Sequence, residues 1–90
     1  MANAGDSRSV LCRDGKAIDL SKDHKPDSPE EESRIKKAGG YINMGRVNGG
    51  LNLTRSFADF DYKKNKSLPY NEQMITCNPD IEEFQVTNKD

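Results

Sequence analysis

The sequence of 90 residues predicts an α+β chain, in which short antiparallel β-strands accompany one α-helix. Asp14-Gly15 lies between two segments that contain apolar residues, and an Asp-Gly pair in this setting is a strong indication of a β-hairpin. Ser28-Pro29 followed by three glutamates is typical of a helix N-terminus. Asn78-Pro79-Asp80 favours a turn between two extended segments near the end of the chain. Strand and helix signals are therefore both present.

The first hairpin has a defined register. Counted outward from the turn, the paired residues are Arg13 with Lys16, Cys12 with Ala17, Leu11 with Ile18, and Val10 with Asp19. Side chains alternate between the two faces of a strand, so Leu11, Ile18 and Leu20 share one face. We expect this face to be buried.

The helix is predicted to begin after the N-cap residue Ser28 and to end near Gly39 or Gly40. Pro29 suits the first helical position, and Glu31 completes a capping box with Ser28. Either glycine can adopt the left-handed conformation that terminates a helix.

Few contacts are predicted to hold this helix. Ion pairs four residues apart contribute about 0.2–0.5 kcal/mol each on its exposed face: Glu30 with Arg34 and Glu32 with Lys36. Only Ile35 and Ala38 offer apolar contact, so we expect the helix to be lightly attached.

A second, weaker hairpin is predicted around Met44-Gly45, because methionine is an unusual first residue of such a turn. Leu51-Asn52-Leu53 alternates like a strand. Thr54 is placed to cap a short helical turn over residues 55–57.

The last third of the chain is predicted to be mostly loop. The polar segment 59–71, which includes three lysines, predicts a solvated loop. Met74–Cys77 and Ile81–Val86 are the extended segments that flank the Asn78-Pro79-Asp80 turn.

The composition is poor for a self-sufficient domain. Only 32% of the residues are hydrophobic, and a chain of this size buries roughly 60–65% of its unfolded surface. Met1 stands directly before an expected strand. We therefore expect the chain to be a piece of a larger domain, and we expect its exposed strands to favour self-association.

Charge and cysteine content exclude several classes of partner. Fourteen basic and fifteen acidic residues give a net charge of −1, so we expect neither nucleic acid nor a membrane surface as a partner. No apolar run approaches the roughly 20 residues of a membrane span. Cys12 and Cys77 lie far apart without a zinc-ligand spacing, which favours free thiols and an intracellular location, cytoplasmic or nuclear.

The segment Asn3–Arg8 is the strongest candidate for a site. Gly5 permits an unusual backbone angle, and Asp6 and Ser7 can bond to nearby backbone amides, so the segment predicts a tight bend that presents a carboxylate. Such a carboxylate can bind a hard cation. An ordinary Asx-type turn without metal is the alternative.

Several of these segments resemble the metal-dependent protein serine/threonine phosphatases of the PP2C (PPM) type, and the segment from residue 63 to 75 is similar to the eukaryotic gamma-type members. The segments that carry the resemblance, in order, are Asn3–Arg8, Val10–Arg13, Asp23–Pro26, Arg34-Ile35 with Ala38–Gly40, Arg46–Leu51 and Asn78–Asp80. It covers Ala2 to about Glu83, so residues 1–90 are expected to be the central portion of such a domain.

The resemblance implies a sandwich of two antiparallel β-sheets flanked by helices, and a pair of Mg²⁺ or Mn²⁺ ions that activate a water to hydrolyse phosphoserine and phosphothreonine in protein substrates. The family's ligands for that pair lie in motifs that this chain lacks, D-G-H-G-G upstream and D-G-x-W-D and D-N downstream. The chain alone is therefore expected to be inactive, and no catalytic residue is assigned.

The resemblance also implies roles for individual residues. Asp6 matches the aspartate of G-D-S-R, which helps hold a third, weaker metal. Arg46 matches a substrate-positioning arginine on a flap, which corresponds here to about residues 24–54; a surface arginine on a hairpin is the alternative. His24 is expected to fix loop geometry rather than to catalyse.

One departure from the family pattern concerns S-R-x-x-G-D, where the chain has Ala58 in place of the glycine. If this position requires a positive φ, the alanine costs about 1 kcal/mol and the placement of Asp59 is affected.

Two functions follow from these observations. The first is a central fragment of a metal-dependent protein phosphatase. The second is a non-catalytic binding module, or part of a pseudophosphatase, that keeps a substrate-recognition surface.

Overall fold

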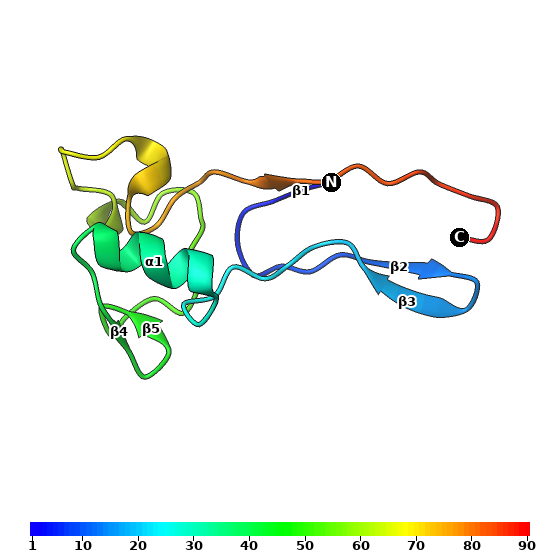
Figure 1. Ribbon diagram of the computed structural model, residues 1–90, viewed down its shortest axis with the longest axis horizontal. Helices are drawn as coiled ribbons and strands as arrows, with labels where there is room; N and C mark the ends of the chain where they lie inside the picture. Colours follow the sequence, from blue (N-terminus) through cyan, green and yellow to red (C-terminus); the bar gives the residue numbers. More distant parts are fainter.

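The computed structural model describes residues 1–90 and has a compact end and an extended end. The compact end holds helix α1 (Pro29–Lys37) and the short strands β4 (Ile42–Asn43) and β5 (Arg46–Val47), and two arms run from it (Figure 1). The molecule measures 48 × 26 × 20 Å. Every strand pair within it is antiparallel, so the predicted α+β class is confirmed.

One arm is the predicted first hairpin, formed by β2 (Val10–Arg13) and β3 (Lys16–Asp19). All four predicted residue pairs are present, and the turn residues have positive φ angles, 53° at Asp14 and 74° at Gly15, as this type of two-residue turn requires.

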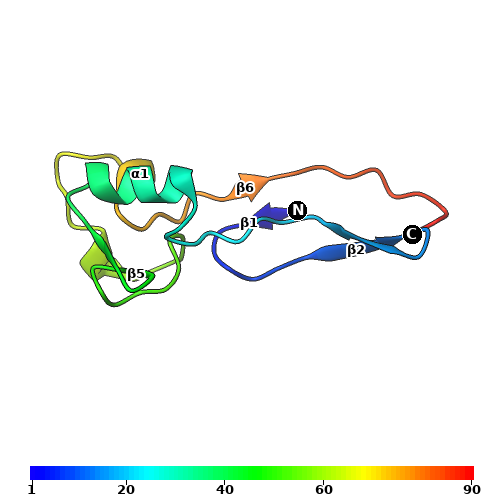
Figure 2. The same cartoon turned by 60° about the horizontal axis from the view of Figure 1, so that its bottom comes forward.

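The predicted burial of one hairpin face is wrong for this chain. Leu11 and Leu20 are only half-buried, and Ile18 keeps 36% of its surface exposed. No second layer of structure covers the hairpin, so its apolar side chains remain in contact with solvent (Figure 2).

The other arm is the C-terminal segment. Strand β1 (Ala2–Asn3) pairs with β6 (Asp80–Ile81), which places the N-terminus beside the start of the C-terminal arm, near the middle of the molecule (Figure 1). The strand covers only the start of the predicted extended segment Ile81–Val86. At the far end Arg13 binds the side chain of Asp90, with its Nε 2.6 Å from Oδ1. All residues from 81 to 90 are exposed.

Helix α1 begins at the predicted place but without the predicted capping box. Ser28 has an extended backbone, and its side chain caps nothing. Glu31 instead turns towards residues outside the helix. The helix ends as predicted, because Gly39 takes a positive φ of 91°.

The attachment of α1 is stronger than the sequence predicts. Ile35 and Ala38 are buried as expected, and the Glu32–Lys36 pair forms at 2.6 Å. Arg34 does not pair with Glu30; it lies 3.1 Å from Glu31 and donates hydrogen bonds to three backbone carbonyls. Polar contacts therefore anchor the helix where apolar ones are few.

The second hairpin is confirmed. Met44 and Gly45 have φ angles of 53° and 74°, as in the first turn. Val47 of this hairpin, Ile35 of α1 and Ile75 are completely buried and form the core of the compact end. The partly buried residues packed against them are Ile42, Leu51, Tyr62 and Met74.

Segment 51–57 differs from its prediction. Leu51 makes a single bridge to Val47, and no helical turn follows Thr54. Arg55 instead bridges Thr76 in the predicted extended segment Met74–Cys77. The loop predicted over residues 59–71 contains two single-turn 3₁₀ helices, Phe60–Tyr62 and Tyr70–Glu72.

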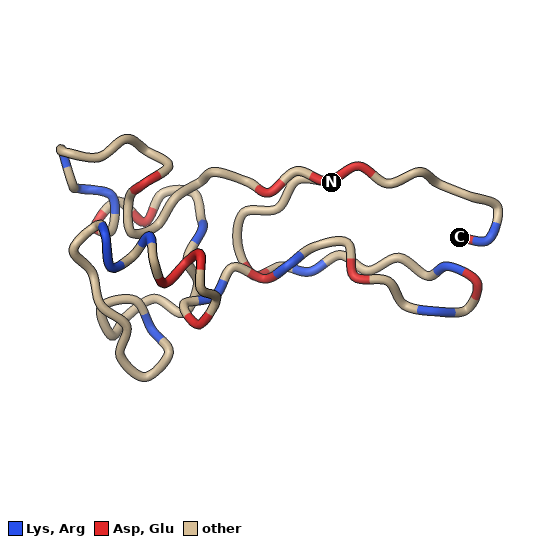
Figure 3. The backbone as a smooth tube through the Cα atoms, in the orientation of Figure 1, with Lys and Arg blue, Asp and Glu red and all other residues tan.

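Acidic residues occupy the first turn of helix α1 and basic residues its last turn, and charges of both signs lie along the first hairpin (Figure 3). None of the helices has the length and apolarity that crossing a lipid bilayer requires.

Candidate functional site

The bend Asn3–Arg8 lies where the two arms meet the compact end. Gly5 has a φ of 138°, and a side chain on it would lie 3.2 Å from the backbone oxygen of Arg55. Asp6 follows, with about a third of its side chain exposed. Its Oδ2 accepts a hydrogen bond of 2.7 Å from Lys25 Nζ, which also donates to the backbone oxygen of Asn52 at 3.2 Å. The carboxylate predicted as a ligand is therefore presented at the surface and tied to the segment 24–54.

His24 lies against the same bend and is 3% exposed. Its Nδ1 accepts a hydrogen bond of 3.0 Å from the backbone amide of Gly5, and its own backbone amide donates to the Gly5 oxygen at 2.9 Å. Its Nε2 lies 2.8 Å from Oδ2 of Asp80. The structure agrees with the expectation that His24 fixes the geometry of its loop.

An ionic cluster, buried except for the half-exposed Asp80, connects this histidine to helix α1. Arg55, 4% exposed, donates from Nη1 to Asp80 Oδ1 at 3.0 Å. It also donates to both carboxylate oxygens of Glu31, at 2.9 and 3.0 Å. Thr54 adds a hydrogen bond of 2.8 Å to Glu31. The cluster brings together four segments that are distant in sequence.

The cluster changes the acidity of its members. Burial raises the pKa of Glu31, but the hydrogen bonds from Arg55 and Thr54 and the charge of Arg34 outweigh burial and lower it to about 2. Burial also opposes ionisation of Asp80, yet its contacts with His24 and Arg55 hold the pKa of that carboxyl below its usual value. Both carboxylates are therefore charged at neutral pH.

Segment 24–54 starts and ends at one place. The backbone amide of Thr54 donates to the backbone oxygen of His24 at 3.1 Å. The first and last residues of the segment therefore lie side by side. Arg46 lies in this segment, at an exposed position of the hairpin β4–β5. Its Nη1 donates to the Gly50 oxygen at 2.8 Å, which leaves its other guanidinium donors available for an anion.

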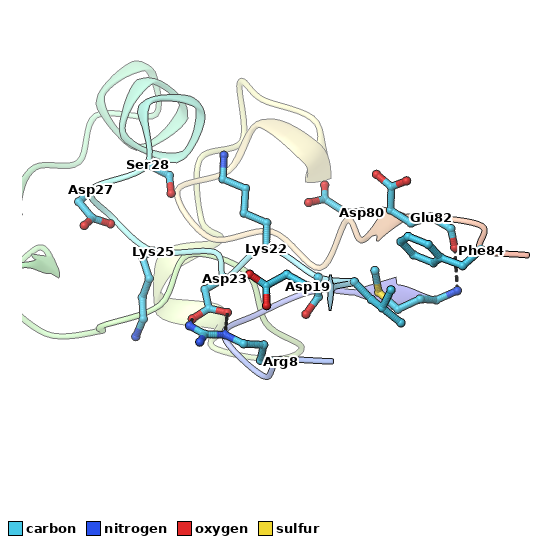
Figure 4. Close-up of a pocket in the computed structure, with 13 residues that line it drawn as sticks. Arg8, Asp19, Lys22, Asp23, Lys25, Asp27, Ser28, Asp80, Glu82 and Phe84 are labelled. Atoms are coloured by element: carbon cyan, nitrogen blue, oxygen red, sulfur yellow. Dashed lines mark hydrogen bonds and ion pairs between the residues drawn. The ribbon is translucent and has the colours of Figure 1, made fainter. Parts of the chain in front are cut away.

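An open hollow of about 780 Å³ lies beside the bend, between residues 19–28 and the C-terminal arm (Figure 4). Arg8 and Asp23 face each other there and form an ion pair of 2.8 Å. Asp19, Asp80 and Glu82 add acidic groups, and Lys22 and Lys25 add basic ones. Its charges are therefore mixed, and it shows no preference for a cation or an anion.

The position that departs from the expected pattern is strained. Ala58 has a φ of 57° and Asp59 a φ of 48°, so two successive residues with side chains occupy the left-handed region. Ser56 donates a hydrogen bond of 2.5 Å to Asp59, which holds the turn.

Comparison with known proteins decides the family. The family model described as protein phosphatase 2C matches residues 1–90. The chain belongs to the protein phosphatase 2C family.

Individual relatives agree with this assignment. The chain is 60% identical over 90 residues to protein phosphatase ppm-1.G of Caenorhabditis elegans and 54% identical over 90 residues to protein phosphatase 2C 1 of Paramecium tetraurelia. It spans 18% and 30% of the length of these two proteins and is covered completely by both. A crystal structure of a phosphatase from Toxoplasma gondii superimposes on 88% of the chain, and 25% of that protein, with a TM-score of 0.85 and 49% identity.

The family implies a metal, and the chain offers only part of a site for one. Asp6 is a partly exposed oxygen ligand of the kind that hard cations prefer, and Lys25 binds one of its two oxygens. No group of three or more histidine, cysteine, aspartate or glutamate side chains lies close enough to hold an ion. These residues fit one ligand of a shared site and do not fit a complete metal centre.

The sequence prediction of the site omitted the ionic cluster. Asp80 was assigned to a turn and Glu31 to a capping box, and Arg55 was assigned no role. No linear spacing relates these residues. The available signals were that Asp80 ends one of the segments that resemble the family and that Arg55 stands at the arginine of the S-R-x-x-G-D pattern.

Proposed function

We propose that this chain is the central part of a protein serine/threonine phosphatase domain that hydrolyses phosphoserine and phosphothreonine in proteins with Mg²⁺ or Mn²⁺. The observation that carries the proposal is the match of all 90 residues to the protein phosphatase 2C family. When bound in the complete domain, the metal ions supply an activated water and neutralise phosphate charge.

The residues of this chain help to hold a metal ion and to orient the substrate. Asp6 contributes one carboxylate oxygen to a weaker metal that residues outside the chain complete, which its exposure on the bend supports. Arg46 binds the substrate from segment 24–54, which acts as a flap; the exposed guanidinium and the adjacent ends of that segment support this role. The chain alone is inactive, and its protein works inside the cell, in the cytoplasm or nucleus, in keeping with its two free cysteines.

The experiment uses a complete domain, in which residues 1–90 replace the matched 90 residues of the Caenorhabditis elegans relative. We call this protein the grafted phosphatase. It is assayed on a phosphothreonine peptide in millimolar Mn²⁺, beside the unmodified relative and the 90-residue chain alone.

The grafted phosphatase is expected to hydrolyse the peptide at a rate close to that of the relative, EDTA is expected to abolish the activity, and the chain alone is expected to show none. An inactive graft that still binds the peptide contradicts the proposal and favours a non-catalytic binding module. Activity of the chain alone contradicts the assignment of its catalytic machinery to flanking sequence.

The role of Asp6 is tested in the same protein. Asp6→Asn is expected to lower kcat without a large fall in melting temperature, because the amide loses the charge but keeps the shape of the side chain. A fall in melting temperature like that of a core truncation, with kcat unchanged, identifies Asp6 as a turn residue.

A further inference from the structure

We propose that His24 is a positioning residue, whose imidazole sets the backbone of the bend that carries Asp6. Asp80 and Arg55, the latter held by Glu31 of helix α1, orient this imidazole. The inference deepens the proposed function and rests on the role of Asp6 in it. It begins from the contact between two buried groups, the Nδ1 of His24 and the backbone amide of Gly5.

The direction of this hydrogen bond determines the state of the ring. A backbone N–H can only donate, so Nδ1 of His24 must be unprotonated in order to accept from Gly5. The ring proton of the neutral imidazole is then on Nε2, where it points at Asp80 Oδ2, 2.8 Å away. The carboxylate therefore selects the tautomer that can hold Gly5.

Both backbone polar groups of Gly5 are held. Its amide donates to the His24 ring and its oxygen accepts from the His24 backbone amide at 2.9 Å. Asn3 Nδ2 lies 3.3 Å from the same oxygen. Since Gly5 directly precedes Asp6, rotation about its backbone would carry the Asp6 carboxylate away from its present place.

The orienting carboxylate is itself fixed from the helix. Arg55 binds the second oxygen of Asp80 at 3.0 Å, and Glu31 holds Arg55 by two hydrogen bonds. A continuous series of contacts thus runs from Glu31 through Arg55, Asp80 and His24 to Gly5. An aspartate in an ordinary surface turn would not need this series of contacts. The geometry therefore points to a role of the series in positioning Asp6.

Two substitutions distinguish the contributions of the two ring nitrogens of His24. Asparagine places its side-chain oxygen near the position of Nδ1, so His24→Asn keeps the acceptor for Gly5 and loses the contact with Asp80. Glutamine places its amide nitrogen near the position of Nε2, so His24→Gln keeps the donor to Asp80 and leaves the Gly5 amide without a partner. Each variant loses one of the two side-chain hydrogen bonds of His24: the buried one with Gly5 in His24→Gln, and the partly buried one with Asp80 in His24→Asn.

Both variants are made in the grafted phosphatase, with Asp6→Asn for reference and Ile35→Val as a mildly destabilised control from the core. His24→Gln is expected to lower kcat roughly tenfold to hundredfold with KM little changed, because a small displacement of a functional group is costly. His24→Asn is expected to restore most of that loss. Hydrogen exchange of the Gly5 amide, followed by mass spectrometry, is expected to accelerate in His24→Gln and to stay slow in His24→Asn.

If Asp6→Asn lowers kcat, the inference is overturned by equal kcat values for the two His24 variants or by a lower kcat for His24→Asn. Full activity of Asp6→Asn refutes the proposed role of Asp6 instead, and the hydrogen-exchange difference then still reports whether His24 holds the bend. If His24→Gln does not fold, Asp80→Asn replaces it, since it leaves the imidazole without a charged partner. A kcat for Asp80→Asn equal to that of Ile35→Val overturns the inference.

Discussion

The buried pair between Glu31 and Arg55 makes the sharpest prediction about stability. Glu31 is 2% exposed, and four hydrogen-bond or ion-pair contacts of 2.8 to 3.1 Å surround its carboxylate. Glu31→Gln removes the charge and leaves Arg55 and Arg34 buried or half-buried without it. Breaking a buried ion pair by removing one partner typically costs about 3–5 kcal/mol, and we expect a loss of this size at pH 7.

The loss of unfolding free energy in Glu31→Gln is expected to become smaller as the pH falls. The pKa of Glu31 falls from 4.5 to about 2 on folding, which corresponds to about 3 kcal/mol of stabilisation by the ionised carboxylate. Because the folded pKa is depressed, this stabilisation is fully present above the unfolded pKa of 4.5 and is lost as the pH falls through about 2. At pH 3 about 1.5 kcal/mol of it remains.

The assay is urea unfolding of the grafted phosphatase and its Glu31→Gln variant at pH 7 and at pH 3. The difference in unfolding free energy between the two proteins is expected to shrink by about 2 kcal/mol at the lower pH. Glu30→Gln is the matched control: this side chain is 79% exposed and 3.5 Å from Arg55, so its effect should stay below about 1 kcal/mol. A Glu31→Gln loss of the same size at both pH values would refute the reasoning.

Three further predictions follow from single features of the structure. Ala58→Gly is expected to stabilise the grafted phosphatase by about 1 kcal/mol in urea unfolding, because Ala58 has a φ of 57°, whereas Ala17→Gly in an extended strand is expected to destabilise it by about 0.5–1 kcal/mol; a loss for both contradicts the strain. Arg46→Ala is expected to raise KM for a phosphopeptide more than for a small aryl phosphate, since only the peptide reaches the exposed hairpin; equal rises would place the guanidinium at the phosphate itself. The 90-residue chain alone is expected to self-associate in size-exclusion chromatography with light scattering, because Ile81 and Val86 are 71% and 77% exposed on the C-terminal arm, and a compact monomer would contradict this.

The sequence by itself determined the elements whose signals are local. Asp14-Gly15 specified the first turn, and with it the register of every residue pair in β2–β3, because a two-residue turn leaves one way to pair the flanking strands. The limits of α1 followed from Pro29 and Gly39 for a similar reason: each restricts or frees its own backbone. The motifs were also sufficient for the family.

Only the tertiary structure decided which partner each polar side chain takes. Glu31 had a local option, the capping box with Ser28, but a buried guanidinium must be neutralised, and Arg55 offers the glutamate a stronger, charge-assisted contact. The same is true of Thr54, which bonds to Glu31 instead of capping a helical turn. Such choices depend on which distant segments meet, and no spacing along the chain records them.

In the first hairpin the sequence predicted which side chains share a face, but it did not predict whether that face is buried. The alternation of Leu11 and Ile18 correctly assigned them to one face, but alternation specifies only a direction and not the presence of a covering layer. In the bend, likewise, the sequence predicted the carboxylate of Asp6, and the fold placed His24 against the neighbouring Gly5. The residue type determines the chemistry of a side chain, whereas its burial and its hydrogen-bond partners are determined only when remote segments pack together.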